Sequence, residues 1–281
     1  MNAQLADAIQ VRKLYLPGCA FPEWVVREAM WPTHSFSETR VFYHAGDSLD
    51  AVKQLCLQRE PCNIATRRLY NEEGLEAAFG WKRGAYAAGS PNFAVYCHAT
   101  VHTEERGFFQ AHVLNLIGCA LDHPSQPDFA EYDTKEKVME FYRRMWQLAL
   151  GAMRSLGKKK LQIYNVGGGA FAGRYGPSFT KEIFEPAFLP LLPEFKAAGI
   201  QVLGYDQGQQ AFTGGRIPDC LNTYREQALE EIVFVNAWDP WSLIGNGNEF
   251  DNSLDGYWGR CSNMAVLGWL QTNPAMEFVA L

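Results

Sequence analysis

Three aspartates follow a strand-like segment near the end of the chain, in the stretch 232–260, IVFVNAWDPWSLIGNGNEFDNSLDGYWGR. Asp239, Asp251 and Asp255 flank the run Gly245-Asn246-Gly247-Asn248. A flexible run of this kind can present backbone N–H groups to an anion such as phosphate. Three nearby carboxylates would weaken a site for phosphate alone, whereas a carboxylate can activate water in acid–base catalysis. The combination predicts a site that binds phosphate at one end and performs acid–base chemistry at the other.

A second glycine-rich loop, NVGGGAFAGRYG at 165–176, follows another strand-like segment. Its three consecutive glycines permit positive φ and a close approach of a ligand, so we expect Gly168→Val to abolish binding and leave the fold intact. Gly167, Gly169 and Ala172 also fit a dinucleotide-binding fingerprint, but Pro177 delays the helix that this motif needs until about Ser178. A glycine-rich turn without a ligand is the alternative interpretation.

The other candidate residues also have structural interpretations. Asp251 can cap a turn or a helix, and Cys220 and Cys261 lack a nearby histidine that would favour a nucleophilic role. Aromatic residues beside the loops can stack on a purine or enclose a ribose, and each can equally be a core residue. These aromatic residues are Phe171, Trp238, Trp241, Tyr257 and Trp258.

The segments between the loops predict the elements that position them. Strand-like segments at 93–101, 111–121, 160–166, 200–206 and 232–240 alternate, from residue 111 onward, with helical segments at 133–157, 178–199 and 220–231. This order is typical of an α/β fold with a largely parallel sheet. Both glycine-rich loops follow carboxyl ends of strands, where such sheets bind ligands.

Two regions are predicted from these patterns. Residues 1–90 are expected to form a mainly helical extension packed on the core, with one helix capped by Ser48, and residues 91–281 to form the ligand-binding core. The turn-forming sequence GSPNF at 89–93 lies at this boundary.

Composition narrows the function classes. The 281 residues carry a net charge of −6, and the only dense basic run is Lys158-Lys159-Lys160, so we expect no nucleic-acid partner. No apolar run has membrane-spanning length, so no membrane association is expected. Seven cysteines without a CxxC pair argue against a disulfide scaffold and a zinc site. We expect a cytoplasmic monomer without metal or cofactor, although an effector exported by a dedicated system would have the same features.

The segment VNAWDP, the run GNGN and the pair Asp255-Gly256 resemble the signature of macrodomains, in which a strand ending in a VNAAN pattern leads to a glycine-rich loop and a helix starting with Asp-Gly. AHVLNLIG (111–118) is similar to the next strand of that family, and KLQIYNVGGGAFAGRYGP (160–177) to its strand and second phosphate loop. The order is permuted, because the Asn-Ala strand comes last here. The arrangement most resembles the MavL-type ADP-ribosyl-arginine hydrolases. The resemblance implies a three-layer macrodomain-like sandwich with permuted strand order and a largely parallel mixed sheet.

The resemblance further implies an ADP-ribose pocket and the removal of mono-ADP-ribose from a modified protein side chain, arginine above all. Asp255 matches the family's ribose-proximal aspartate, and Asp239 and Asp251 are further catalytic candidates. The loop departs from the family pattern, and no Gln-Glu-Glu signature of poly(ADP-ribose) glycohydrolases is present. A non-enzymatic ADP-ribose reader is the alternative, and a dinucleotide-dependent oxidoreductase is disfavoured. The expected ligand-binding residues are Asn236, Trp238, Gly245, Asn246, Gly247, Asn248, Gly167, Gly168, Gly169, Ala170, Phe171, Ala172, Gly173 and Asp206.

Overall fold

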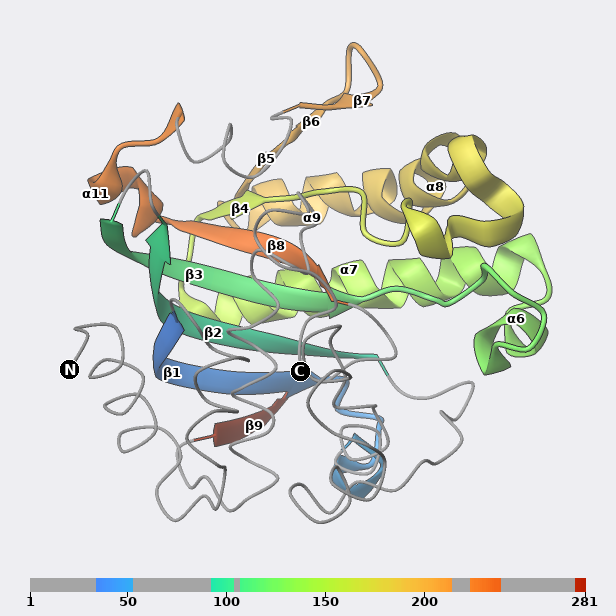
Figure 1. The fold of residues 1–281 in the computed structure, drawn as a ribbon, viewed down its shortest axis with the longest axis horizontal. Coiled ribbons are helices and arrows are strands. Elements are labelled where there is room, and N and C mark those ends of the chain that lie inside the picture. The colour runs from blue at the N-terminus through green and yellow to red at the C-terminus, as the bar shows by residue number, and fades with distance from the viewer. Residues whose placement is uncertain (1–33, 53–91, 104–106, 214–222, 239–275) are drawn as a thin grey trace.

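A computed structural model describes residues 34–52, 92–103, 107–213, 223–238 and 276–281 (Figure 1). Its centre is a seven-stranded sheet in the order β5-β4-β8-β3-β2-β1-β9. The pairs β1–β9, β3–β8, β4–β8 and β4–β5 are parallel, while β1–β2 and β2–β3 are antiparallel. The predicted α/β class with a mixed, mostly parallel sheet is therefore confirmed. The strands are β1 (His34–Tyr43), β2 (Phe93–Thr103), β3 (Gly107–Ile117), β4 (Lys160–Gln162), β5 (Gln201–Leu203), β8 (Ile232–Trp238) and β9 (Met276–Ala280).

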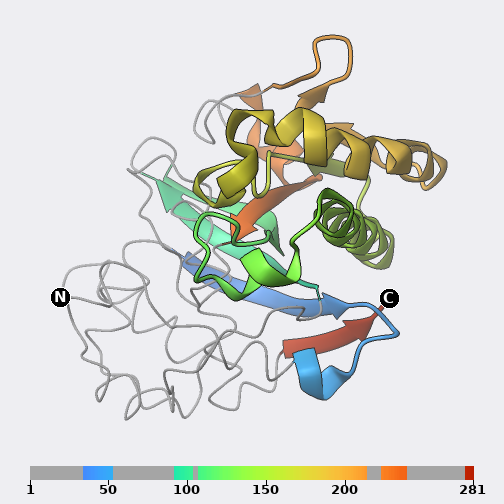
Figure 2. The same cartoon turned by 90° about the vertical axis from the view of Figure 1, so that its right-hand side faces the viewer.

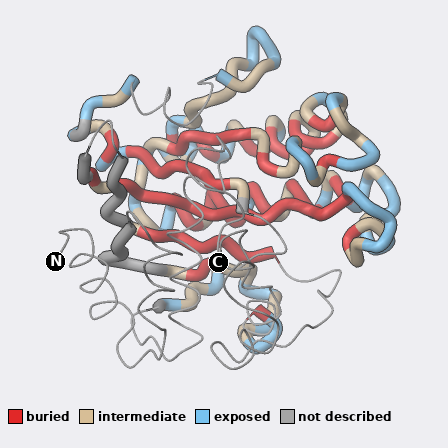
Figure 3. The backbone as a smooth tube through the Cα atoms, in the orientation of Figure 1, coloured by how far each residue is buried: buried red, intermediate tan, exposed pale blue. Residues whose placement is uncertain are grey.

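The central strands are buried because their side chains are apolar on both faces. Residues 111–117 of β3 and 232–236 of β8 are all buried, as Figure 3 shows in red. Strands covered on both faces read as continuous apolar runs rather than as alternating ones. His112, Asn115 and Asn236 are the polar exceptions within these two runs. A buried polar side chain needs hydrogen-bond partners, so these three residues mark places in the sheet where specific polar contacts are made.

Helix α7 (Lys135–Leu156) confirms the helix predicted at 133–157. Thr134 begins it, with its side chain accepting a hydrogen bond from the Lys137 N–H, and Gly157 ends it in the left-handed conformation at φ 66°. The buried face includes Trp146, which stacks edge-on against Phe188 at 4.8 Å between ring centroids. The helix contacts β1, β2 and β3, and in Figure 2 it lies on the same side of the sheet as the helices that follow β4.

The predicted helical region 178–199 is a series of short segments, because its prolines interrupt a regular helix. Pro186, Pro190 and Pro193 each occupy one of the first two positions of a segment, where the missing proline N–H costs least. The segments are η2 (Thr180–Phe184), α8 (Glu185–Phe188), η3 (Leu189–Leu191) and α9 (Leu192–Ala197). They follow η1 (Ala170–Ser178), a 3₁₀ segment interrupted at Gly173 and Gly176, where φ is 50° and 46°. The regular helical path therefore begins near Ser178, as predicted.

Two predicted segments differ from the structure in extent. The strand expected at 200–206 is divided at Gly204, which has φ 90°, into β5 and β6 (Tyr205–Asp206). Strand β6 pairs with β7 (Ala211–Phe212) in a separate two-stranded sheet. The helix expected at 220–231 is represented in the described residues by α11 (Glu226–Leu229), preceded by an extended Arg225.

The prediction that residues 1–90 form a helical extension is wrong for residues 34–43. These residues form β1, which lies between β2 and β9 in the sheet. Val41 and Phe42 are wholly buried there, while a helix turn follows at 49–52, where the Ala51 N–H donates to Ser48 Oγ over 3.4 Å. The rest of 1–90 lies outside the described residues. In the part of the chain that is described, no helix has both the length and the apolar character needed to cross a membrane.

Candidate ligand-binding site

Three adjacent parallel strands end at the same edge of the sheet. Strand β8 lies between β3 and β4, and all three point to the right in Figure 1. We call the loop after β3 (118–126), the loop after β4 (163–178) and the end of β8 (Asn236–Trp238) the carboxyl-edge site. Such an edge is where open α/β sheets bind ligands, and both glycine-rich loops of the sequence begin there.

The loops after β3 and β4 are packed against each other. A Cβ atom added at Gly118 would lie 3.2 Å from the Gly167 Cα, and the Leu121 N–H donates a hydrogen bond of 3.1 Å to the Phe171 carbonyl. A Cβ at Gly173, whose φ is 50°, would overlap the Leu121 carbonyl oxygen. The two loops therefore form one rigid rim beside the end of β8.

The glycines of the second loop do not all serve the same purpose. Gly167 has φ 82° and faces the hydroxyl of Tyr142, and a Cβ at Gly168 would overlap the Asn165 side chain. Packing alone therefore explains these two glycines, and Gly168→Val would displace Asn165 rather than leave the fold untouched. Gly169 differs, because a Cβ added there would meet no atom of the described residues within 4 Å. Gly169 is the position at which a ligand could come close to the backbone.

Some amides of this loop are already engaged. The Gly168 N–H donates to the Asn165 carbonyl over 3.0 Å, and the Ala172 N–H donates to the Gly169 carbonyl over 3.1 Å. An anion nest made from every amide of 167–173 is therefore not available. Ala172 is buried, whereas Gly169 and Ala170 are exposed and Gly169 leaves open space, so the Gly169-Ala170 corner is the part of the loop best placed to contact a phosphate.

A pair of buried asparagines lies at the ends of β3 and β8. Asn115 and Asn236 are opposite each other in the parallel register, and both are fully buried. The Asn115 Nδ2 donates to the Val95 carbonyl over 2.8 Å, and the Asn236 Nδ2 donates to Asn115 Oδ1 over 2.7 Å. The Val95 carbonyl can only accept a hydrogen bond, so it fixes the orientation of both amides. Asn236 must therefore turn its own oxygen away from the pair.

Three buried amide oxygens of the carboxyl-edge site accept no hydrogen bond from the described residues, and besides Gln126 Oε1 in the loop after β3 two of them belong to asparagines. One is Asn236 Oδ1, and the other is Asn165 Oδ1, whose Nδ2 donates to Thr180 Oγ1 over 3.1 Å. Leaving a buried acceptor unsatisfied costs about 1–3 kcal/mol. Each oxygen is therefore well suited to accept a hydrogen bond from a hydroxyl or an amine.

The rim is supported by residues that the sequence patterns did not single out. The Ala120 N–H donates to Asp128 Oδ2 over 3.0 Å, and the Cys119 N–H donates to the Tyr142 hydroxyl over 3.0 Å. Burial, followed by the nearby Asp128 carboxylate, raises the pKa of the Cys119 thiol well above its ordinary value, so this cysteine is not a nucleophile. Asn115 and Asn165, polar residues within or just after apolar strands, were the sequence signal that could have indicated the buried amides of this region.

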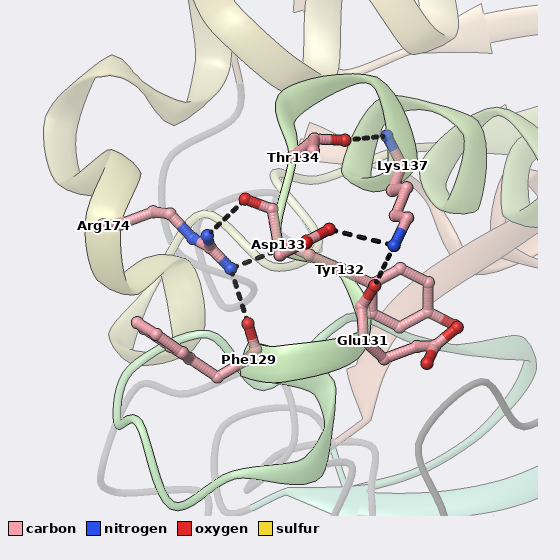
Figure 4. Close-up of polar contacts among 7 residues, drawn as sticks. All are labelled: Phe129, Glu131, Tyr132, Asp133, Thr134, Lys137 and Arg174. Carbon is pink, nitrogen blue, oxygen red and sulfur yellow. Dashed lines mark hydrogen bonds and ion pairs between the residues drawn. The ribbon is translucent and has the colours of Figure 1, made fainter.

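Arg174 is a second support residue. Its guanidinium donates to the carbonyls of Phe129, Tyr132 and Asp133 over 3.0, 2.7 and 2.9 Å at the end of α6 (Pro127–Glu131), as Figure 4 shows. The guanidinium carbon also lies 4.5 Å from the centroid of the Phe129 ring. These bonds satisfy carbonyls that a helix end leaves without partners, and they tie the loop after β4 to the connection between β3 and α7. Arg174 therefore has a structural role, because its guanidinium is occupied by hydrogen bonds to backbone carbonyls.

The structure brings some of the predicted residues together and separates one. Asn236 and the 167–173 segment meet at the carboxyl-edge site, whereas Asp206 lies in the β6–β7 hairpin. The Asp206 Oδ1 accepts the Gly208 and Gln209 N–H groups over 2.8 and 3.1 Å, so this carboxylate closes its own turn. The remaining predictions lie outside the described residues: the side chain of Trp238, and Asp239, Gly245, Asn246, Gly247, Asn248, Asp251 and Asp255.

Comparison with known proteins found no family model and no curated protein that matches this chain.

Proposed function

We propose that the protein is an ADP-ribosyl hydrolase that removes mono-ADP-ribose from a modified side chain, with arginine as the favoured linkage. The observation that carries the proposal is Asn236, which lies near the end of β8, the strand next to β4, and keeps a buried oxygen without a hydrogen-bond donor among the described residues. The resemblance to macrodomains assigns this asparagine to the distal ribose. A ribose hydroxyl is a donor of the kind that Asn236 Oδ1 lacks.

The adjacency of strands supports the same proposal at the level of the fold. The sequence predicts the two glycine-rich loops at adjacent strand ends, and here β8 lies next to β4. A permuted chain can still build the pocket, because the strands meet in space whatever their order in the sequence. The finer fold assignment, a three-layer macrodomain-like sandwich with a permuted order, is part of this proposal.

The proposed binding mode divides the ligand among three groups of residues. Asn236 accepts a hydrogen bond from the distal ribose, and the Gly169-Ala170 corner approaches the pyrophosphate. The run Gly245–Asn248 supplies further amides, and aromatic residues such as Phe171 and Trp238 border the adenine or the ribose.

The proposed reaction is cleavage of the bond between the anomeric carbon and the side-chain nitrogen. A carboxylate, Asp255 in the first instance, takes a proton from water while the water oxygen bonds to the anomeric carbon. The electron pair of the broken carbon–nitrogen bond stays with the guanidine, which recovers the proton. Asp239 and Asp251 stabilise the positive charge of the oxocarbenium-like transition state and of the leaving group. These steps use residues of this chain alone.

The test is incubation of the protein with ADP-ribosylated proteins that carry defined arginine, glutamate or serine linkages, with released ADP-ribose as the readout. We expect release from the arginine linkage and a fall of about a hundredfold or more in turnover for Asp255→Ala. Affinity for free ADP-ribose should hold or rise in this variant, because a negative charge near the pyrophosphate is removed. The turnover of Asp239→Ala and Asp251→Ala, measured in parallel, shows how much each of these two aspartates contributes to catalysis.

Each contrary outcome has a defined meaning. A merely structural Asp255, such as a helix cap, predicts a stability loss of about 1 kcal/mol with turnover nearly unchanged. Binding of ADP-ribose without turnover of any linkage would replace the hydrolase with a reader module. Binding of NAD without binding of ADP-ribose would point to an oxidoreductase.

A further inference from the structure

A cluster of potential metal ligands lies midway along β2 and β3, beside the start of β8 and on the side of α11 in Figure 1. His98 of β2 and His112 of β3 are direct partners in the antiparallel register, and Glu230 lies in the turn between α11 and β8. The two imidazole rings are stacked with centroids 4.2 Å apart and planes 18° from parallel. Three separate segments of chain therefore present two imidazoles and one carboxylate at one point.

The distances between the ligand atoms are close to those of a tetrahedral metal site. Glu230 Oε2 lies 3.6 Å from His112 Nε2 and 3.8 Å from His98 Nε2, and the three ligand atoms are all within 4.8 Å of one another. Bonds of about 2.0–2.1 Å at a tetrahedral angle would place two zinc ligands about 3.4 Å apart. The cluster needs to contract by only a few tenths of an ångström at two of its three edges.

His112 is already oriented as a metal ligand. Its Nδ1 lies 2.8 Å from the hydroxyl of Tyr96, a residue that is itself buried, and this contact directs Nε2 toward Glu230. Metal-bound histidines are held in this way, by a hydrogen bond at the ring nitrogen that does not bind the metal.

A cation already lies beside the cluster. The Lys158 ammonium is 2.8 Å from His112 Nε2 and donates to the Glu230 carbonyl over 3.0 Å. An ammonium that donates to Nε2 requires a lone pair on that nitrogen, which is the same lone pair that a metal would use. The flexible stem of lysine allows the ammonium to leave, and rotation of the partly exposed His98 ring would direct its Nε2 to the same point.

We propose that His98, His112 and Glu230 bind a divalent first-row transition ion of the zinc class, and that the ion displaces the Lys158 ammonium. Two imidazoles and one carboxylate match the ligand preference of zinc, and a fourth position remains for water. The ion would join the middle of β2 and β3 to the turn before β8, through residues that the ADP-ribose proposal does not use. The two proposals are therefore independent.

The experiment titrates the metal-free protein with Co²⁺ at pH 7.5 and follows visible absorption, with Zn²⁺ as the competitor. We expect saturable absorption typical of nitrogen and oxygen ligands, a rise in the melting temperature on binding, and unchanged affinity for ADP-ribose. His98→Gln and Glu230→Gln should each weaken binding by about tenfold or more. Lys158→Met should strengthen it by a similar factor, because the competing ammonium is removed while the stem is kept. His123→Gln, a change in an exposed histidine outside the cluster, serves as the control.

Three results would overturn the metal site. The first is the absence of Co²⁺ binding to the wild-type protein at millimolar metal. The second is near-ultraviolet charge transfer from sulfur, which would assign the ion to cysteines. The third is equal affinity of the wild-type protein and the His98→Gln and Glu230→Gln variants, with circular dichroism showing that both variants are folded.

Discussion

At the scale of single residues, the glycines of the 167–173 loop have different roles. Packing requires some of them, whereas Gly169 leaves open space. In the sequence the three consecutive glycines are equivalent, and all of them fit a phosphate-binding loop. Gly167 and Gly168 face Tyr142 and Asn165, contacts made by side chains that no local pattern could identify. Gly169 has φ −93°, and a Cβ added to it would have no atom of the described chain within 4 Å, so it alone isolates the effect on a ligand.

Gly169→Val should weaken ADP-ribose binding by about tenfold or more while leaving the melting temperature unchanged, because the added side chain would occupy ligand space rather than protein space. Calorimetry with ADP-ribose measures the affinity, and a thermal melt measures the melting temperature. Gly46→Val is the matched control, since a Cβ at Gly46 also meets no atom of the described residues within 4 Å. Equal affinities for wild-type and Gly169→Val would show that the loop is only a turn.

The orientation of Asn236 illustrates what the sequence could and could not supply. The Val-Asn-Ala segment marked Asn236 as a site residue, and the structure places it at the carboxyl edge. Its orientation depends on Asn115 and Val95, which lie more than a hundred residues away in the chain. Side-chain direction at a site is set by such partners, and a motif cannot reveal them.

At the scale of elements, the sequence predicted best where the stop and start signals are local. Thr134 and Gly157 bound α7 within two residues of the predicted ends, because a cap acts through the backbone of its own helix. The short strands were predicted less well. The predicted strand 160–166 is reduced to Lys160–Gln162, and the chain then turns away toward the candidate site. A strand ends where its neighbours stop pairing with it, which is not a local property.

Gly157→Ala should lower the free energy of unfolding by about 1 kcal/mol, because an L-residue is strained in the left-handed conformation that ends α7. Steric conflict is not the cause, since a Cβ at Gly157 meets no described atom within 4 Å. Urea unfolding followed by circular dichroism measures the difference. Gly46→Ala, an equally open glycine whose φ is not positive, should change stability by less than half as much. Equal losses in the two variants would contradict the role assigned to the helix cap.

At the scale of the whole molecule, the sheet joins segments from both ends of the described chain. The long apolar runs of the sequence predicted the α/β class and the strands β2, β3 and β8. Because the glycine-rich loops follow such runs, the sequence also predicted the edge of the sheet on which ligands should bind. Strand β9 was missed because it has only five residues, and β1 was missed because it obtains its regular structure by pairing with two distant strands, β2 and β9, the latter more than two hundred residues away. The catalytic half of the site stays a prediction, since Asp239, Asp251 and Asp255 lie outside the described residues.

The pairing of β9 with β1 gives a test of how the sheet is closed at this edge. The Leu281 N–H donates to the Tyr43 carbonyl and the Ala45 N–H donates to the Leu281 carbonyl, each over 2.8 Å, just beyond the paired residues of β1 and β9. The Leu281 side chain also reaches α7, since a Cβ added at Gly151 would lie 3.0 Å from its Cδ1. The segment 276–281 thus connects β1 to the long helix α7.

Removing residues 276–281 should lower the melting temperature substantially, because β1 loses a neighbouring strand and α7 loses the cover that Leu281 provides. Leu281→Ala should cost less, about 1–2 kcal/mol, since this partly buried side chain is lost while the backbone pairing remains. Glu277→Gln is the control: it breaks an exposed ion pair with Arg40 and should change stability by about 0.5 kcal/mol or less.

ADP-ribose affinity in the truncated protein, measured at a temperature where it stays folded, should match that of the full chain, because β9 and the β4–β8 pair are separated by three strands of the sheet. A truncated protein that melts like the wild type would show that β1 does not need this partner, and a folded truncated protein that had lost ADP-ribose binding would place the ligand at the other edge of the sheet.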